Sequence, residues 1–265
     1  MIDSHIHLAS TKYSNDLDQI FFNLKKHNVE YVINIGTDIK TSKLAISQSH
    51  KYKYQSYATV GVHPEEINSD VNLNVISTLE KLIKDEVVVA VGEVGLDKTY
   101  IKNLPKEKQQ LHFTWQKNWL DLQIQLARQN DYPLILHSRE TTDEMLKVVN
   151  TFQKKIKFVW HCFTENTEVA RLVIENGGYL SFTGIVTYKN VDSILDVIKY
   201  VPKDRYMIET DGPYLVPEPL RKQGTKLNMP WNVFYVAEKI AKVKGESVEN
   251  VIKQTINNTC KFFKI

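Results

Sequence analysis

The sequence predicts an α/β protein folded as one (β/α)8 barrel, and three observations support this. Short apolar runs rich in Val, Ile and aromatic residues recur eight times along the chain. Segments with helical period separate most of these runs, and polar residues follow many of them directly. Parallel strands covered by helices read as continuous apolar runs, and eight such units close a barrel.

The predicted strands are the apolar runs themselves, because β-branched and aromatic residues favour a buried, pleated sheet. These runs span residues 2–7, 31–36, 57–63, 87–95, 133–137, 158–162, 179–184 and 206–210. The predicted helices are segments in which apolar residues recur three and four positions apart. They span residues 17–27, 73–84, 116–130, 167–176 and 191–200.

The chain is expected to form a single domain over residues 1–265. No linker rich in Pro, Gly or Ser divides it, and its composition does not shift along its length. An open, doubly wound sheet is the alternative arrangement. It is disfavoured because no Gly-x-Gly-x-x-Gly motif follows the first predicted strand.

The composition is that of an ordinary globular protein, with 42% hydrophobic and 25% charged residues. Cys162 and Cys260 are too few for a disulfide framework, so a reducing, cytoplasmic location is expected. No apolar run approaches the ~20 residues of a membrane span, and the N-terminus lacks the regions of a signal peptide. The net charge of +3 neither requires nor excludes a polyanionic substrate.

The first predicted strand carries two histidines one residue apart, in the stretch "DSHIH". Alternate side chains of a strand point to the same face, so His5 and His7 project together while Ile6 points the other way. Two imidazoles on one face can bind a metal ion. The same pattern also occurs on strands without a ligand, so the hypothesis requires further ligands elsewhere in the chain.

Further polar residues follow other predicted strands, where active sites of (β/α)8 barrels lie. The full set at the strand ends is His5, His7, His63, Glu93, His137, His161 and Asp211. Each residue taken alone could cap a helix or be a buried side chain with an ordinary partner. Together they would be costly to bury unpaired, so a shared cation is the simplest way to satisfy them.

The ligand set indicates two metal ions, because it offers more donors than one ion needs. We expect His5, His7 and Asp211 to hold the first ion, His137 and His161 to hold the second, and Glu93 to bridge them. Imidazoles and carboxylates without thiolates suit Mg, Mn or Zn. Such a pair of ions activates water and clamps both reacting oxygens of an ester, which predicts hydrolysis.

Other residues near the strand ends are expected to serve the reaction. Asp211 is the expected general base, because a carboxylate beside the ions can accept a proton from water. Arg139 is expected to bind a phosphate, and His63 to contact a phosphate or donate to a ligand. Asp97 and Lys98 are placed in the loop after the fourth strand, within reach of substrate, although a solvated loop is an equal alternative. Strand alternation is expected to turn Cys162 away from the site.

Seven stretches together resemble the TatD family of metal-dependent deoxyribonucleases, which belongs among the amidohydrolase-type barrels. They are "IDSHIHL" (2–8), "GVHPEE" (61–66), "VGEVGLD" (91–97), "LHSRE" (136–140), "WHCFTEN" (160–166), "LSFTGIVTYKN" (180–190) and "IETDGPYLVPEP" (208–219). The resemblance covers almost the whole chain. It implies a TIM barrel that cleaves phosphodiester bonds in DNA, often from a 3′ end. It also implies metal ligation by His5, His7, Glu93, His137, His161 and Asp211.

The sequence departs from the family around the loops that face the substrate. Lys98 stands where the family usually has an aromatic residue, and the run to Gln116 is longer. Thr164 with Glu165, and Leu227 with Met229, also replace residues common in the family. None of these changes removes a ligand, so they concern which substrate the site accepts.

Three alternatives to a DNA-cleaving enzyme are considered at this stage. The same metal centre could hydrolyse another ester, such as a nucleotide phosphomonoester, a lactone or an aminoacyl ester. A metal-binding scaffold without catalysis is disfavoured because all six ligands are present. Nucleic-acid binding without cleavage is disfavoured because no basic stripe interleaved with aromatics is found. DNA is the expected partner, without a membrane or an obligate protein partner, and a monomer is expected.

Overall fold

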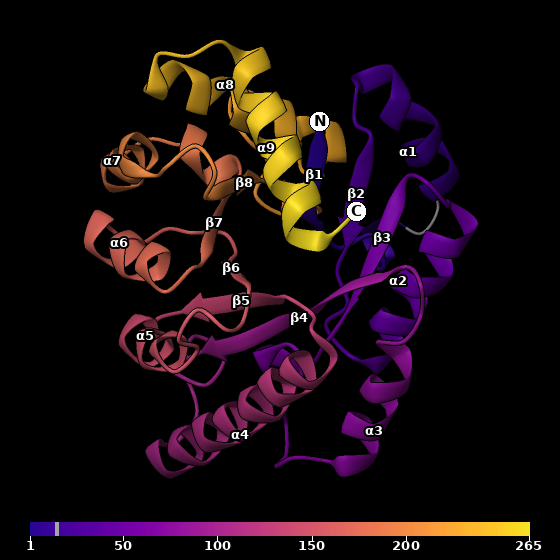
Figure 1. The fold of residues 1–265 in the computed structure, drawn as a ribbon, viewed down its shortest axis with the longest axis vertical. Coiled ribbons are helices and arrows are strands. Elements are labelled where there is room, and N and C mark those ends of the chain that lie inside the picture. The colour runs from indigo at the N-terminus through magenta and orange to yellow at the C-terminus, as the bar shows by residue number, and fades with distance from the viewer. Residues whose placement is uncertain (14–15) are drawn as a thin grey trace.

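The computed structural model describes residues 1–13 and 16–265, and it confirms the predicted barrel (Figure 1). Eight parallel strands pair in chain order, from β1 to β8. They are β1 (Ile2–Ile6), β2 (Tyr31–Asn34), β3 (Ser56–Val60), β4 (Val88–Asp97), β5 (Leu134–Arg139), β6 (Phe158–Trp160), β7 (Tyr179–Phe182) and β8 (Tyr206–Ile208). A parallel bridge between Ile6 and Gly212 joins β1 to the segment after β8, so the sheet closes on itself.

The helices surround the strands in Figure 1, as burial of both faces of a parallel sheet requires. They are α1 (Leu17–Leu24), α2 (Ile39–Lys51), α3 (Leu73–Leu82), α4 (Lys106–Asn130), α5 (Thr142–Asn150), α6 (Thr167–Glu175), α7 (Asp192–Tyr200), α8 (Val233–Lys244) and α9 (Val248–Phe263). Within the described ranges, no helix is both long and apolar enough to cross a membrane.

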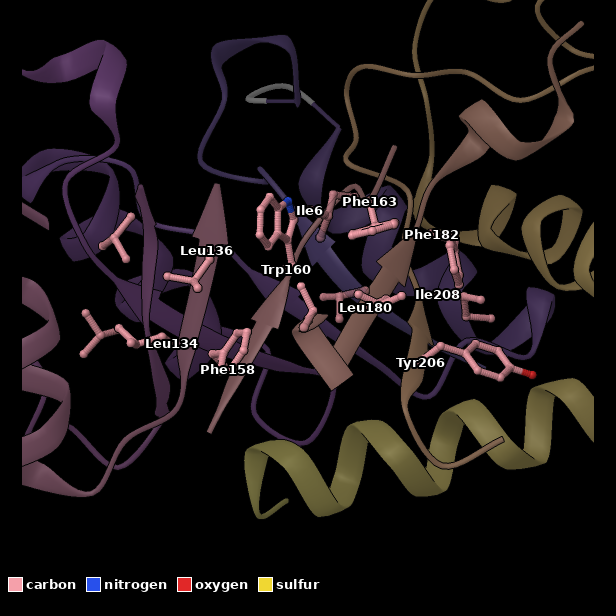
Figure 2. Packing of buried hydrophobic residues seen from close by; sticks show 14 of the residues in the cluster. Ile6, Leu134, Leu136, Phe158, Trp160, Phe163, Leu180, Phe182, Tyr206 and Ile208 are labelled. Carbon is pink, nitrogen blue, oxygen red and sulfur yellow. The ribbon is translucent and has the colours of Figure 1, made fainter. Parts of the chain in front are cut away.

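Strand alternation separates the interior of the barrel from the layer beneath the helices. Ile135, Val159 and Met207 belong to a cluster in the interior, and Phe262 and Phe263 of α9 join it there. The residues next to them on the strands pack into the larger core under the helices. Figure 2 shows this outer layer on four successive strands, with Leu134, Leu136, Phe158, Trp160, Leu180, Phe182, Tyr206 and Ile208. This interior cluster, called the apolar floor below, therefore lies at the end of the barrel that α9 covers.

The structure differs from the sequence prediction mainly in the helices. α4 begins at Lys106, well before the predicted residue 116. The prediction missed its first turns because they are exposed and lack the periodic apolar residues that indicate a helix. α2, α5, α8 and α9 were not assigned from the periodicity. Several strands end one to three residues earlier than predicted, because the residues at the ends of these runs no longer pair with the neighbouring strand.

Candidate metal centre

Along each strand, the side chains that face the barrel interior change from apolar at the floor to polar at the opposite end, where they form a cluster. On β5, Ile135 faces the interior, and His137 lies two residues further along the same face. Val159 of β6 and His161 repeat this relation. The backbone N–H of His161 still donates to the carbonyl of Leu136, at 3.1 Å, so the pairing of the strands positions both imidazoles.

The seam between β1 and the end of β8 positions a second group of side chains. The N–H of Asp211 donates to the carbonyl of His5 at 2.9 Å, and the N–H of His7 donates to the carbonyl of Gly212 at 2.8 Å. Asp211 has a φ of 54°, which turns the chain at this point. Closure of the barrel therefore brings residues more than 200 positions apart in the chain into contact.

The first set of donor atoms comprises Nε2 of His5, Nε2 of His7, Oδ1 of Asp211 and Oε2 of Glu93. The two imidazole nitrogens lie 3.3 Å apart. His5 Nε2 is 3.2 Å from Glu93 Oε2 and 3.6 Å from Asp211 Oδ1. His7 Nε2 is 3.6 Å from Glu93 Oε2 and 3.2 Å from Asp211 Oδ1. Nitrogen and oxygen donors thus surround one small space.

The second set surrounds the other oxygen of Glu93. His137 Nδ1 and His161 Nε2 each lie 2.8 Å from Glu93 Oε1, and they are 3.4 Å from each other. His63 Nε2 lies 3.4 Å from the same oxygen. The two oxygens of one carboxylate therefore face two separate sets of donors.

Both donor sets fit a divalent cation. Ligand atoms about 2.1 Å from an ion in tetrahedral arrangement lie about 3.4 Å apart, close to the 3.2–3.6 Å spacings of the first set. In the second set His137 and His161 lie at the hydrogen-bond distance of 2.8 Å from Glu93 and 3.4 Å from each other, so an ion there would replace the hydrogen bonds. Glu93 is almost fully buried. Burial disfavours its charge, but His161, His63 and His5 outweigh that effect and hold the pKa of Glu93 well below its usual range. An ionised, buried carboxylate between imidazoles is the chemistry of a bridging ligand.

His5 and His161 stack face to face, with ring centroids 4.0 Å apart. Burial, together with the neighbouring His161, lowers the pKa of His5. Burial acts on His161 in the same direction, but Glu93 and Glu209 outweigh it and raise the pKa of His161 well above its usual value. Without a metal, the proton of this stacked pair therefore resides on His161, next to the buried carboxylates.

His63 has a hydrogen-bonding pattern that differs from that of the other imidazoles. Its Nδ1 accepts the backbone N–H of Glu65 at 3.1 Å, so in the neutral ring the proton lies on Nε2. Burial, as the largest influence, lowers the pKa of His63 and favours this neutral form. His63 thus presents a donor toward Glu93, which corresponds to one of its two predicted roles; the other, contact with a phosphate, stays a prediction.

Asp97 was placed wrongly by the sequence analysis: it is the last residue of β4, not part of the following loop. It is fully buried, and its Oδ2 lies 3.0 Å from His137 Nε2. Its Oδ1 accepts the N–H of Thr99 at 2.6 Å and also the hydroxyl of Thr99. Asp97 therefore orients His137 by accepting from its Nε2, which leaves Nδ1 facing Glu93, where it donates to the carboxylate at 2.8 Å and would offer its lone pair to a metal ion.

The two basic residues expected to contact substrate differ in their surroundings. Lys98 follows β4 as predicted, but its ammonium lies 2.6 Å from Glu144 of α5, so much of its charge is already balanced. Arg139 ends β5 and is exposed. Among the described residues it makes no ion pair, so its guanidinium remains available to an anion. Arg139 is the better placed of the two for a phosphate.

The sequence analysis missed Glu209. This buried residue lies two positions beyond Met207, which faces the barrel interior, so strand alternation could have identified it. Its Oε1 lies 3.4 Å from Nδ1 of His161 and accepts the N–H of Cys162 at 2.8 Å. Glu209 therefore lies against His161 on the side opposite Glu93, where its negative charge helps to raise the pKa of that imidazole.

Cys162 lies outside β6, contrary to the prediction that strand alternation orients it. It has a φ of 47°, and burial raises the pKa of its thiol to about 12. A thiol that stays protonated is a poor ligand and a poor nucleophile.

Comparisons with known proteins identify the family of the chain. The family model described as "TatD related DNase" matches residues 2–264. The chain is 35% identical to the uncharacterized metal-dependent hydrolase YabD of Bacillus subtilis, over 100% of this chain and 99% of that protein. It is 28% identical to the 3′-5′ ssDNA/RNA exonuclease TatD of Pantoea ananatis, over 99% of each.

A solved structure shows the same architecture. The crystal structure of YJJV, a TatD homolog from Escherichia coli K12, has a TM-score of 0.88 and 26% sequence identity, and the match covers 100% of this chain and 98% of that one. The barrel, the two donor sets and the family match therefore lead to one conclusion. The chain belongs to the TatD-related DNase family and is a metal-dependent hydrolase.

Proposed function

We propose that this protein hydrolyses phosphodiester bonds of DNA, as a 3′ exonuclease on single-stranded or frayed ends. The observation that carries the proposal is the division of Glu93 between two donor sets, with Oε2 facing His5 and His7 and Oε1 facing His137 and His161. Centres with two divalent ions suit phosphodiester cleavage, which requires charge stabilisation at two oxygens. The name of the Pantoea ananatis relative supports nucleic acid as the substrate.

The residues of the centre have defined roles in this proposal. His5, His7 and Asp211 would hold one ion, His137 and His161 the other, and Glu93 both. Two divalent ions, of Mg, Mn or Zn, would lower the pKa of a water molecule and offset the charge of the phosphate when bound. Asp97 accepts from Nε2 of His137 and so would keep the lone pair of Nδ1 directed at the centre, while Glu209 lies 3.4 Å from Nδ1 of His161 on the far side of that ring.

Asp211 is the proposed general base. Burial disfavours its charge, but the hydrogen bond from His7 outweighs that effect and lowers the pKa of Asp211. The carboxylate is therefore ionised at neutral pH and can accept a proton from the attacking water. Arg139, at the exposed end of β5, binds a phosphate of the substrate with its guanidinium fork.

The proposal is tested with Mn²⁺-loaded protein and single-stranded DNA labelled at its 5′ end. The expected products shorten one nucleotide at a time from the 3′ end, and EDTA abolishes their formation. Asp211→Asn should lower kcat by about 10²–10⁴-fold while circular dichroism shows a retained fold. Wild-type rates in this variant would remove Asp211 from its role, and cleavage that persists in EDTA would refute the metal mechanism.

The same experiment separates the alternatives. Turnover of a nucleotide phosphomonoester, a lactone or an aminoacyl ester, with DNA left intact, would identify another esterase on the same centre. A folded protein that takes up no divalent ion would indicate a scaffold. We further propose that residues 1–265 act as one catalytic domain, that the protein is monomeric and that it works in the cytoplasm. Light scattering coupled to size-exclusion chromatography tests the oligomeric state.

A further inference from the structure

Two exposed tyrosines lie beside the metal centre, one next to each donor set. Tyr100, in the loop after β4, has 44% of its surface exposed, and Tyr214, after β8, has 51%. The ring of Tyr100 stands edge-on to His63, with centroids 6.2 Å apart. The ring of Tyr214 stands edge-on to His7, with centroids 6.4 Å apart. Each phenol thus flanks a histidine of a different set and keeps much of its ring in solvent.

Each tyrosine also has a cation nearby. The ammonium of Lys12 lies 4.5 Å from the centroid of Tyr214, and Lys12 is exposed. The backbone N–H of Lys98 donates to the carbonyl of Arg139 at 3.1 Å, which ties Arg139 to the start of the loop that carries Tyr100. Aromatic rings paired with cations are the elements of single-strand binding sites, where bases stack and phosphates meet positive charge.

We propose that Tyr100 and Tyr214 are stacking platforms for the nucleobases on either side of the scissile phosphate of a single-stranded nucleic acid, with Arg139 and Lys12 binding the adjoining phosphates. This inference rests on the proposed function, and it specifies how that substrate is held. In a duplex the base faces are already stacked, so such platforms select unpaired ends. Stacking uses the ring face that every base has, so sequence preference is weak.

The chemistry of the two phenols agrees with this role. Burial of part of the ring, followed by the neighbouring Glu65, raises the pKa of Tyr100. Burial also raises the pKa of Tyr214, with Asp211 and Glu65 acting in the same direction. Both rings therefore stay neutral at physiological pH and do not repel phosphate. The charge of Glu65 disfavours a phosphate beside the phenols, which directs the backbone to the centre and to the cations.

The test compares two DNA strands of equal length, one natural and one with abasic tetrahydrofuran units at its two 3′-terminal positions. Binding to metal-loaded protein is measured by stopped-flow fluorescence anisotropy, read before cleavage. The protein variants are Tyr100→Leu, Tyr214→Leu and the corresponding Phe substitutions. Tyr200→Leu is the matched control, because Tyr200 has the same 44% exposure as Tyr100 but ends α7, which places it at the opposite end of the barrel.

We expect each Leu variant to weaken binding of the natural strand by roughly 5- to 100-fold, the range for loss of one stacked base. The Phe variants keep the ring and should bind within about threefold of wild type. The abasic strand should bind weakly to wild type and lose little more in the Leu variants. Equal binding of both strands to wild type, or equal losses in Tyr200→Leu and the other Leu variants, overturns the proposal.

The design also separates this inference from the proposed nuclease activity. If the protein discriminates between the two strands but cleaves neither, the platforms stand and the nuclease assignment fails. If it cleaves the natural and abasic strands with equal KM, the nuclease assignment stands and the platforms fail. Melting temperatures of all variants check that the substitutions leave the fold intact.

Discussion

The interaction between Asp97 and His137 predicts that replacing one carboxylate oxygen of Asp97 by an NH2 group weakens metal binding. In Asp97→Asn the side-chain oxygen must stay with Thr99, which donates both its N–H and its hydroxyl to Oδ1. The new NH2 group then takes the place of Oδ2, 3.0 Å from His137 Nε2. Two donors cannot face each other, so His137 must accept at Nε2 and carry its proton on Nδ1. That proton points at Glu93 Oε1, 2.8 Å away, and blocks a metal.

The size of the effect follows from this change of tautomer. Loss of the residue that hydrogen-bonds to the second nitrogen of a metal-bound histidine lowers metal affinity by about 10–100-fold. At about 1.4 kcal/mol for each factor of ten, this corresponds to about 1.4–2.8 kcal/mol. The range agrees with the about 1.5–3 kcal/mol expected for a hydrogen bond to a charged group. The loss should fall on the ion held by His137 and His161, because the first donor set does not contact Asp97.

Isothermal titration of Mn²⁺ or Zn²⁺ into chelator-stripped protein measures the two binding events. Asp85→Asn is the matched control, because Asp85 makes the same kind of pair with His50, at 2.8 Å, on the surface. We expect the control to bind both ions as wild type does. In Asp97→Asn one site should weaken by the stated factor while the other is retained. Wild-type affinity at both sites would refute the tautomer argument.

Three further predictions concern the centre and its support. Glu93→Gln should lower the bound metal, measured by mass spectrometry, from two ions per chain to one or fewer; retention of both would contradict its bridging role. Since the carboxylates raise the pKa of His161, metal binding must displace its proton, so affinity should fall as pH falls. Titrations in buffers of different ionisation enthalpy should detect proton release, and its absence would contradict the assignment. Gly95→Ala should cost about 2–3 kcal/mol in urea unfolding, because its Cβ would lie 1.9 Å from the carbonyl oxygen of His137. An unchanged free energy of unfolding in Gly95→Ala would contradict the steric explanation.

Much of the fold could be predicted from local patterns. All eight apolar runs are strands in the structure, because a parallel strand buried on both faces needs continuous apolar side chains. Helices α1, α3, α4, α6 and α7 were found from the recurrence of apolar residues three and four positions apart, although α9, which also has a buried apolar face, was not assigned. α2 was missed because its sequence is polar and rich in Ser and Lys, and only its packing on the sheet makes it a helix. Local propensity is weak where tertiary contacts decide the conformation.

The centre was predictable to the extent that it depends on strand ends. His5, His7, His137, His161, Glu93 and Asp211 converge in the structure as their positions after the apolar runs indicated. Glu209 escaped notice because it looks like an ordinary residue near a turn, although its spacing from Met207 contained the signal. The position of Asp97 depended on where β4 ends, which the pattern of apolar residues does not define.

The order of apolar runs along this chain is sufficient to determine the barrel and to place seven polar residues at one rim. Closure of the sheet decided the rest: which oxygen of Glu93 faces which histidines, that Asp97 supports His137, and that Tyr100 and Tyr214 flank the centre. The physical reason is that strand patterns depend on neighbours in the chain. Contacts across the barrel mouth depend instead on register and on loops that meet only when residues 200 positions apart are joined.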